Sequence, residues 1–213
     1  MEFTDFLKEY AIAITGGIAS GKSSLCEFLR NEGFTVIDAD KLSRSLTDRH
    51  QPALEDIRQA FGDSFIDEQG LLNRRKMREL VFSDPSAKAK LEAIIHPRLQ
   101  EATIEELKKH QLFSHPQIWF YEASLIYERG IQDRFREVWL VYCTEQLQLE
   151  RLTRRDQIDS DNAKKIIANQ LSNEAKKQLA TFVLDSSISK QHLFEQASEH
   201  IQRLTHKKDL IRG

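Results

Sequence analysis

The chain has 213 residues, of which 40% are hydrophobic and 30% are charged, with a formal net charge of −2. This composition is typical of a globular domain with one large core. The near-neutral charge provides no basic field for nucleic acid or an anionic membrane. The sequence contains neither a run of 18 apolar residues nor an apolar signal core in residues 1–10, so we expect a cytoplasmic protein. Cys26 and Cys143 lie in apolar segments and are expected to be buried free thiols.

Residues 16–23, Gly-Gly-Ile-Ala-Ser-Gly-Lys-Ser, fit the pattern G-x-x-x-x-G-K-[ST] of a phosphate-binding loop. The apolar run 10–15 before this phosphate loop predicts a buried parallel strand, and the apolar spacing after it predicts a helix. The loop N–H groups and the positive end of that helix form an anion site. Lys22 can then reach the β- and γ-phosphates of a nucleotide, and the Ser23 hydroxyl can ligate Mg²⁺.

Two carboxylates, Asp38 and Asp40, follow a second predicted strand at residues 34–37. Parallel sheets gather their sites at the carboxyl ends of the strands, so we expect these carboxylates beside the phosphate loop. A kinase that acts on a hydroxyl needs such a carboxylate to accept or steer the proton. The alternative is that one of them only caps the next helix. Arg44, one turn beyond Asp40, is placed to contact a substrate phosphate or to form a surface salt bridge.

Further strands are predicted at residues 118–121, 138–143 and 182–184, separated by helical patterns. This alternation predicts an α/β domain with a parallel sheet flanked by helices. The interval between the second and third strands is far longer than a crossover requires, so we expect a helical insert. The predicted parts are a core at about 10–50, 116–150 and 180–206, and an insert at about 52–112 with helices at 74–82 and 86–110.

His96-Pro97 lies within the second helix of the insert. Proline lacks the N–H that would continue the hydrogen-bond ladder, so we expect the helix to break there, with a buried histidine at the kink.

A polar, basic segment at residues 151–174, here called the lid segment, follows the fourth predicted strand. It is predicted to close over phosphates as a mobile lid, the alternative being a solvated helix surface. Arg151 and Arg155 share one helical face, whereas Arg154 points elsewhere. Their guanidinium groups are suited to the oxygens of a transferring phosphoryl group.

The motifs together resemble the dephospho-coenzyme A kinase family along nearly the whole chain. Those motifs are Thr15–Ser23, Val36–Asp40 with Arg44, Phe61-Gly62, Gly70–Arg74, Val81-Phe82, Leu91-Glu92, His96-Pro97, Tyr121–Glu128, Arg151–Arg155, Gln170 and Phe182–Asp185. The chain departs from the family pattern at four positions. Ala19 replaces a usual glycine and should be accommodated if its φ is negative; the others are Asn73, Glu122 and Ser186.

The resemblance implies the fold of P-loop nucleoside triphosphate hydrolases and the ATP-dependent phosphorylation of the ribose 3′-hydroxyl of dephospho-coenzyme A. It implies ATP and Mg²⁺ as cofactors, dephospho-coenzyme A as a small-molecule partner, and neither nucleic acid nor membrane; it leaves the oligomeric state open. The implied catalytic residues are Lys22, Asp40, Arg151 and Arg155, with Ser23 as metal ligand. ATP contacts fall on Gly16, Gly17, Ile18, Ala19, Ser20, Gly21, Lys22, Ser23 and Ser24, and substrate contacts on Asp38, Arg44, Arg74, His96 and Glu122.

Two other functions are compatible with a phosphate loop alone. One is a kinase for another small molecule, such as a nucleoside monophosphate or a sugar, which only the family motifs argue against. The other is a GTPase switch, since Asp67-Glu-Gln-Gly70 matches the D-x-x-G element of such proteins. The sequence has no Asn-Lys-x-Asp motif to read guanine, which argues against the switch.

Overall fold

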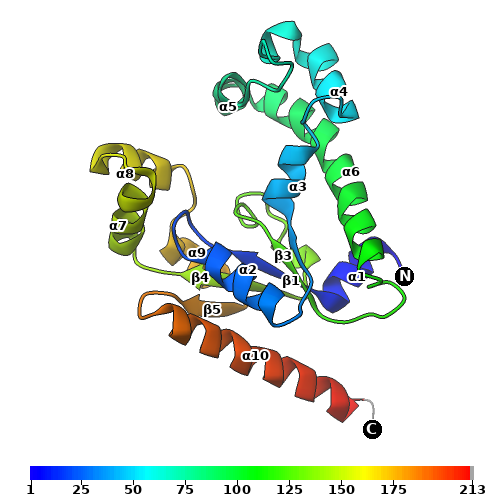
Figure 1. The fold of residues 1–213 in the computed structure, drawn as a ribbon, viewed down its shortest axis with the longest axis vertical. Coiled ribbons are helices and arrows are strands. Elements are labelled where there is room, and N and C mark those ends of the chain that lie inside the picture. The colour runs from blue at the N-terminus through cyan, green and yellow to red at the C-terminus, as the bar shows by residue number, and fades with distance from the viewer. Residues whose placement is uncertain (212–213) are drawn as a thin grey trace. The chain divides into compact units, whose positions relative to one another are not determined.

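The computed structural model describes residues 1–211, with side chains through residue 204. The chain divides into two compact units, which we describe separately: a core unit of residues 1–36 and 117 onward, and a helical unit, Ile37–Pro116. No helix in the described range is long and apolar enough to cross a membrane. The helices are α1 (Phe3–Tyr10), α2 (Lys22–Asn31), α3 (Ala39–Ser45), α4 (Pro52–Phe61), α5 (Arg74–Ser83), α6 (Pro85–Lys109), α7 (Glu145–Asp156), α8 (Ser160–Ala168), α9 (Asn173–Leu179) and α10 (Lys190–Ile211), with short 3₁₀ turns η1 (Asp63–Phe65) and η2 (Gln132–Arg134) (Figure 1).

A five-stranded sheet in the order β2-β3-β1-β4-β5 forms the centre of the fold. Parallel pairing joins β1 to β3, β1 to β4, and β4 to β5, which confirms the predicted α/β class. The predicted strands are all present with small shifts at their ends. The strands are β1 (Ala11–Thr15), β2 (Val36–Asp38), β3 (Trp119–Glu122), β4 (Glu137–Tyr142) and β5 (Phe182–Asp185).

Helices α2 and α10 cover one face of the sheet. Phe28 of α2 and Phe194 of α10 stack with ring centroids 4.4 Å apart, and both rings pack against the central hydrophobic cluster. Alternate residues of β1, Ile12 and Ile14, enter that cluster, because successive side chains of a strand point to opposite faces. The cluster also holds Leu25, Leu29, Phe120, Trp139, Val141, Leu184 and Leu193. Cys26 and Cys143 are buried and unpaired, as predicted.

Several helices begin at a side chain that accepts a hydrogen bond from a free backbone N–H, as the physics of helix ends requires. Asp38 accepts from the N–H of Lys41 at 2.8 Å, and Asp84 accepts from Ser86 and Ala87. The same role belongs to Asn73, Thr144, Asp159 and Ser172. The predicted separation of the helices at 74–82 and 86–110 is confirmed, and the break falls at Asp84-Pro85.

Within the helical unit, α6 contacts α3, α4 and α5. The predicted break of this helix at His96-Pro97 is wrong, because α6 runs through Pro97. His96 is exposed rather than buried at a kink. Arg98, directly after the proline, holds the helix on both sides of Pro97: its guanidinium donates to the Ile94 carbonyl at 2.9 Å and pairs with Asp56 of α4. Burial of Leu99, Thr103 and Leu107 beyond the proline also favours continuation.

Candidate functional site

The predicted phosphate loop connects β1 to α2 in the core unit, as expected for its motif. Gly21 has φ +101° at the start of α2, a conformation that favours glycine. Gly16 and Gly17 are required for a different reason, which is close approach. A Cβ on Gly16 would lie 2.5 Å from Ser20 Oγ and 2.7 Å from the Val141 carbonyl oxygen. The loop therefore turns within a space that no side chain at Gly16 fits.

Ala19 departs from our expectation, because its φ is +60° rather than negative. This is the left-handed region, where a Cβ crowds the following carbonyl. The usual glycine of the family would adopt this conformation without that crowding. The loop is therefore closed at the cost of local backbone strain at one residue.

Lys22 begins α2, and its ammonium group forms an ion pair with Glu122 at the end of β3. The Lys22 Nζ–Glu122 Oε1 distance is 2.9 Å, and the two side chains are 14% and 5% exposed. Arg30 Nη2 lies 3.3 Å from the other Glu122 oxygen. Burial opposes the charge on Glu122, but Lys22, a Cys26 hydrogen bond and Arg30 outweigh it and lower the pKa of Glu122. The site thus holds a charged carboxylate between two cations.

Burial raises the pKa of the neighbouring Cys26 thiol, and the Glu122 carboxylate raises it further. Cys26 is therefore a protonated donor to Glu122 rather than a nucleophile.

Arg151 of α7 joins the end of the phosphate loop to the residues after β5. Its guanidinium donates to the Ser186 carbonyl at 2.7 Å, to Ser186 Oγ at 3.1 Å and to the Ser20 carbonyl at 3.4 Å. Ser186 Oγ also donates to the Ser20 carbonyl at 2.5 Å. Arg155, by contrast, is exposed and bound to its neighbour Asp156, and Arg154 is exposed.

The remaining loop residues present hydroxyl groups around the start of α2. Ser20 is buried, and its Oγ has no hydrogen-bond partner among the described residues. Ser23 and Ser24 occupy the first turn of α2, where Ser23 is exposed. A cradle without room for a Cβ, with a buried unpaired hydroxyl and a lysine at its end, fits the phosphates of a nucleotide. No group of three or more His, Cys, Asp or Glu in the described range is arranged to hold a metal ion.

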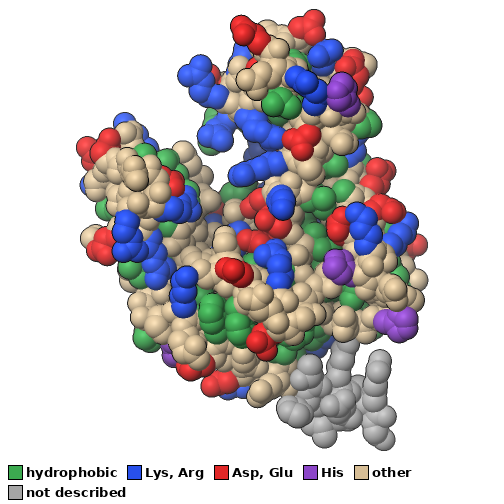
Figure 2. Space-filling model, in the orientation of Figure 1, with side chains coloured by type: hydrophobic (Ala, Val, Ile, Leu, Met, Phe, Trp, Pro, Cys, Tyr) green, Lys and Arg blue, Asp and Glu red, His purple; other side chains and the backbone are tan. Residues whose placement is uncertain are grey.

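The helical unit carries the other predicted site residues. Asp38 caps α3, which is the structural role left open for it, and Asp40 lies in the first turn. Arg74 Nη2 donates to the Arg44 carbonyl at 3.0 Å and to Thr47 Oγ1 at 2.9 Å. Figure 2 shows Lys and Arg side chains gathered over α5 and the end of α3 in this unit. The exposed basic residues there are Arg44, Arg74, Arg75 and Arg78.

The strand before Asp38, β2, does not pair with the loop strand β1. In the sheet, β3 stands between β2 and β1, and Glu122 at its end lies opposite Ile14 of β1. The carboxylate that contacts the loop lysine is therefore Glu122. The sequence contained the signal, a carboxylate directly after an apolar strand, but not the order of the strands.

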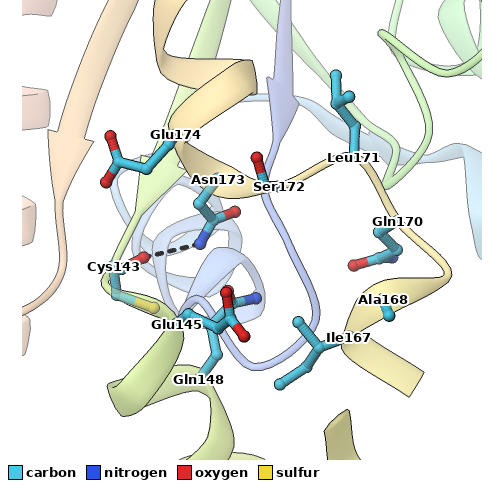
Figure 3. Close-up of a pocket in the computed structure, with 10 residues that line it drawn as sticks. All are labelled: Cys143, Glu145, Gln148, Ile167, Ala168, Gln170, Leu171, Ser172, Asn173 and Glu174. Atoms are coloured by element: carbon cyan, nitrogen blue, oxygen red, sulfur yellow. Dashed lines mark hydrogen bonds between the residues drawn. The ribbon is translucent and has the colours of Figure 1, made fainter. Parts of the chain in front are cut away.

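Three side-chain amides were not predicted as loop contacts: Gln148, Gln170 and Asn173. They line a cavity of about 170 Å³ with Cys143, Glu145, Ile167, Ala168, Leu171, Ser172 and Glu174. Figure 3 shows Asn173 turned toward Cys143, whose carbonyl accepts its Nδ2 at 2.8 Å. Gln170 belongs to the motifs of the resemblance, but no periodic pattern marks the other two.

Comparison with known proteins agrees with this geometry. The family model described as dephospho-CoA kinase matches residues 10–191. A protein of Staphylococcus saprophyticus named dephospho-CoA kinase is 37% identical over 182 residues, 85% of this chain and 87% of that protein. A Thermus thermophilus crystal structure superposes with a TM-score of 0.81 at 29% identity, covering 91% of this chain and 96% of that one. A Campylobacter jejuni dephospho-CoA kinase superposes with a TM-score of 0.64 at 27% identity, covering 93% of this chain and 98% of that one. A match that includes the phosphate loop, the helical unit and the lid segment shows that the chain belongs to the dephospho-CoA kinase family.

Proposed function

We propose that this protein transfers the γ-phosphoryl group of ATP to the ribose 3′-hydroxyl of dephospho-coenzyme A, giving coenzyme A and ADP. The observation that carries the proposal is the family match over residues 10–191. That range contains the phosphate loop and the whole helical unit, Ile37–Pro116, and not only the loop shared by many nucleotide-binding proteins. The transfer completes the synthesis of coenzyme A.

Residues 16–24 are proposed to hold the phosphates of ATP. The backbone N–H groups of the loop and the N-terminus of α2 supply an anion site, and Lys22 supplies a full positive charge. The ion pair with Glu122 holds that ammonium group at the start of the helix. We therefore propose that Glu122 positions Lys22, in addition to the substrate contact that the family resemblance implies for it.

Arg151 and Arg155 are proposed to stabilise the negative charge that spreads over the phosphoryl oxygens during transfer. Arg151 already contacts the Ser20 carbonyl of the loop. Arg155 lies one turn further along α7 and would approach the phosphates only if the lid segment closes.

Asp40 is proposed as the carboxylate that accepts or steers the proton of the acceptor hydroxyl. The hydrogen bond that the N–H of Lys41 donates to Asp38 Oδ1 supports this choice, because Asp38 is then engaged in capping α3. Arg44 and Arg74 are suited to the diphosphate of dephospho-coenzyme A, since guanidinium groups bind phosphate oxygens in pairs. His96 is exposed on α6, which leaves it accessible to the substrate.

Mg²⁺ fits the chemistry of the site through the Ser23 hydroxyl, at the position where phosphate-loop proteins place this ligand. Magnesium keeps several water ligands and binds substrate phosphates, so it does not require a cage of protein carboxylates. When bound, the ion neutralises charge on the β- and γ-phosphates.

The test is an ATP-consumption assay with a panel of acceptors and identification of the product by mass. We expect one added phosphoryl group on dephospho-coenzyme A, located on the ribose by fragmentation. Nucleoside monophosphates, gluconate and shikimate should give no product, and GTP should replace ATP poorly. Consumption of ATP with one of those acceptors and not with dephospho-coenzyme A would contradict the proposal. A slow hydrolysis of GTP without any acceptor would instead support the GTPase switch.

A further inference from the structure

The first half of the phosphate loop is held by three side-chain amides, here called the amide clamp: Gln148, Gln170 and Asn173. The N–H of Gly17 donates to Asn173 Oδ1 at 3.1 Å, and the N–H of Ile18 donates to Gln170 Oε1 at 2.8 Å. Gln148 Nε2 donates to the Ile18 carbonyl at 2.8 Å. Consecutive backbone groups of the loop thus bond to side chains from α7, from the segment between α8 and α9, and from the start of α9.

The clamp also explains the glycine at position 17. A Cβ on Gly17 would lie 2.4 Å from Gln148 Nε2 and 2.7 Å from Asn173 Oδ1. Both contacts are shorter than van der Waals distance, so a side chain here would displace the clamp. The glycine is therefore required by the amides and not by a positive φ.

An ion pair between a buried lysine and a partly exposed glutamate supports the clamp. Lys176 is fully buried, and its Nζ lies 2.8 Å from Glu128 Oε1; the same oxygen accepts from the N–H of Leu171 at 3.0 Å. Lys176 Nζ also donates to the Ser124 carbonyl at 3.5 Å. A buried ammonium group is strongly destabilising without its partner. The pair therefore fixes residues 171–176, which include Asn173 and follow Gln170 directly.

We propose that the amide clamp preorganises the phosphate loop for nucleotide, with Gln148, Gln170 and Asn173 as positioning residues. The inference rests on the proposed function, since it takes this loop as the ATP site. A glycine-rich loop has many conformations to lose on binding, and contacts that fix it beforehand reduce that cost. An amide suits this role because it offers donor and acceptor atoms without a charge. A carboxylate in its place would repel the phosphates.

The decisive comparison is Gln170→Met against Gln178→Met, an exposed glutamine on α9. Calorimetric titration with ATP and with ADP measures nucleotide binding without any acceptor. We expect Gln170→Met to raise both dissociation constants roughly tenfold, and KM for ATP with them. The change in kcat should stay below about threefold, because the lost contact acts equally on ground and transition states. Gln178→Met should match the wild type.

A further variant separates positioning from simple structural support. Gln170→Glu keeps an acceptor oxygen for the Ile18 N–H but adds a negative charge. We expect it to restore the hydrogen-exchange protection of the loop amides that Gln170→Met loses, while nucleotide affinity stays low. Recovery of affinity together with protection would also support the proposal, whereas loop protection that is unchanged in Gln170→Met while nucleotide affinity is lost would contradict it.

Nucleotide affinity unchanged in folded Gln170→Met would overturn the proposal. If that variant fails to fold, the same nucleotide-affinity measurement is made on Gln148→Met. Its control is the exposed Gln146→Met, which also lies on α7. The binding measurement needs no phosphoryl transfer. Wild-type protein that binds ATP but leaves dephospho-coenzyme A unmodified would refute the proposed function, and the clamp would still be judged on binding.

Discussion

The phosphate loop and the middle of the lid segment, residues 154–169, differ in the sequence separation of the residues that hold them in place. Loop contacts join residues far apart in sequence: Gly17 and Asn173 are 156 positions apart, and Lys22 and Glu122 are 100 apart. In the middle of the lid segment, Arg155 pairs with its neighbour Asp156. Asp159 there bonds to Asn162, three residues on.

This difference teaches where the molecule can move. The loop contacts are buried or partly buried and form only when the sheet and the segment after α8 fold together, so they share the stability of the core unit. Exposed local pairs contribute about 0–1 kcal/mol each. Both ends of the lid segment contact the loop, through Arg151 and through Gln170 and Asn173. We therefore expect lid motion in residues 154–169 rather than in the whole predicted range.

The largest expected effect contrasts the loop lysine with a lysine in the middle of the lid segment. Lys22→Ala should lower kcat by at least about 10²-fold, because electrostatic contacts to a transferring phosphoryl group contribute several kcal/mol. Lys164→Ala removes an exposed pair with Asp161 and should change kcat less than about twofold. Steady-state kinetics on both variants, with circular dichroism as the folding control, makes the comparison. A near-normal rate for Lys22→Ala would contradict the assignment of the loop.

The next effect separates two arginines on one helix. Arg151→Met should lower kcat/KM by about 10²-fold, since it removes the donors to Ser20 and Ser186 as well as a positive charge near the phosphates. Arg155→Met removes an exposed guanidinium and should cost roughly tenfold or less. Equal losses in the two variants would show that closure brings both arginines to the reacting group.

Hydrogen exchange should locate the moving part directly. Without ligand, we expect strong protection in residues 171–176 and weak protection in 154–169. Adding an unreactive ATP analogue with dephospho-coenzyme A should slow exchange in 154–169 by about tenfold, because closure removes those amides from opening equilibria. Uniform slowing from 151 to 174 would support the longer lid of the sequence prediction. No slowing anywhere would mean that this segment is a static surface helix.

The features that could be predicted from the sequence are those set by neighbouring residues, and the features that could not are those set by contacts between distant residues. The phosphate loop, the strands and the helix start at Asp84-Pro85 each depend on residues close in sequence, and all were predictable. Strand order was not, so Glu122 could not be placed beside Lys22. The bond between Ile18 and Gln170 spans 152 positions, and no periodicity encodes it. The continuation of α6 through Pro97 likewise involves tertiary contacts, such as the pair between Arg98 and Asp56.

A smaller effect concerns the pH dependence of stability. Glu122→Gln should lower the free energy of unfolding at neutral pH by about 2 kcal/mol, because Lys22 and Arg30 lose a buried counter-charge. The pKa of Glu122 is lowered in the folded state. Its contribution is therefore complete above the unfolded pKa of about 4.3 and is lost as pH falls through the folded pKa.

Denaturant titrations across that range should show the gap between wild type and Glu122→Gln closing in acid. The control is Glu105→Gln, which breaks an exposed pair with Lys108 and should shift stability by less than about 0.5 kcal/mol at any pH. A gap that stays constant down to the lowest pH would show that the Glu122 carboxylate is not the source of the stabilisation.

The smallest effect tests the strain at Ala19, the one loop residue other than glycine that adopts a positive φ, +60°. Ala19→Gly relieves about 1–2 kcal/mol of left-handed crowding, but glycine also gives the unfolded chain more freedom, which offsets about 0.4–1 kcal/mol. The net expectation is a gain of about 0.5–1 kcal/mol in the free energy of unfolding. Ala89→Gly, at an exposed position inside α6, should instead lose about 1 kcal/mol, because there the alanine already has a helical backbone. Denaturant titration of the two variants measures the change in the free energy of unfolding, and we expect opposite signs, which are easier to distinguish than two sizes of the same sign. If both variants lose stability, the Ala19 methyl group stabilises the loop by more than the backbone strain destabilises it. The alanine in place of the family glycine would then be a stabilising feature of this loop and not only a tolerated strain.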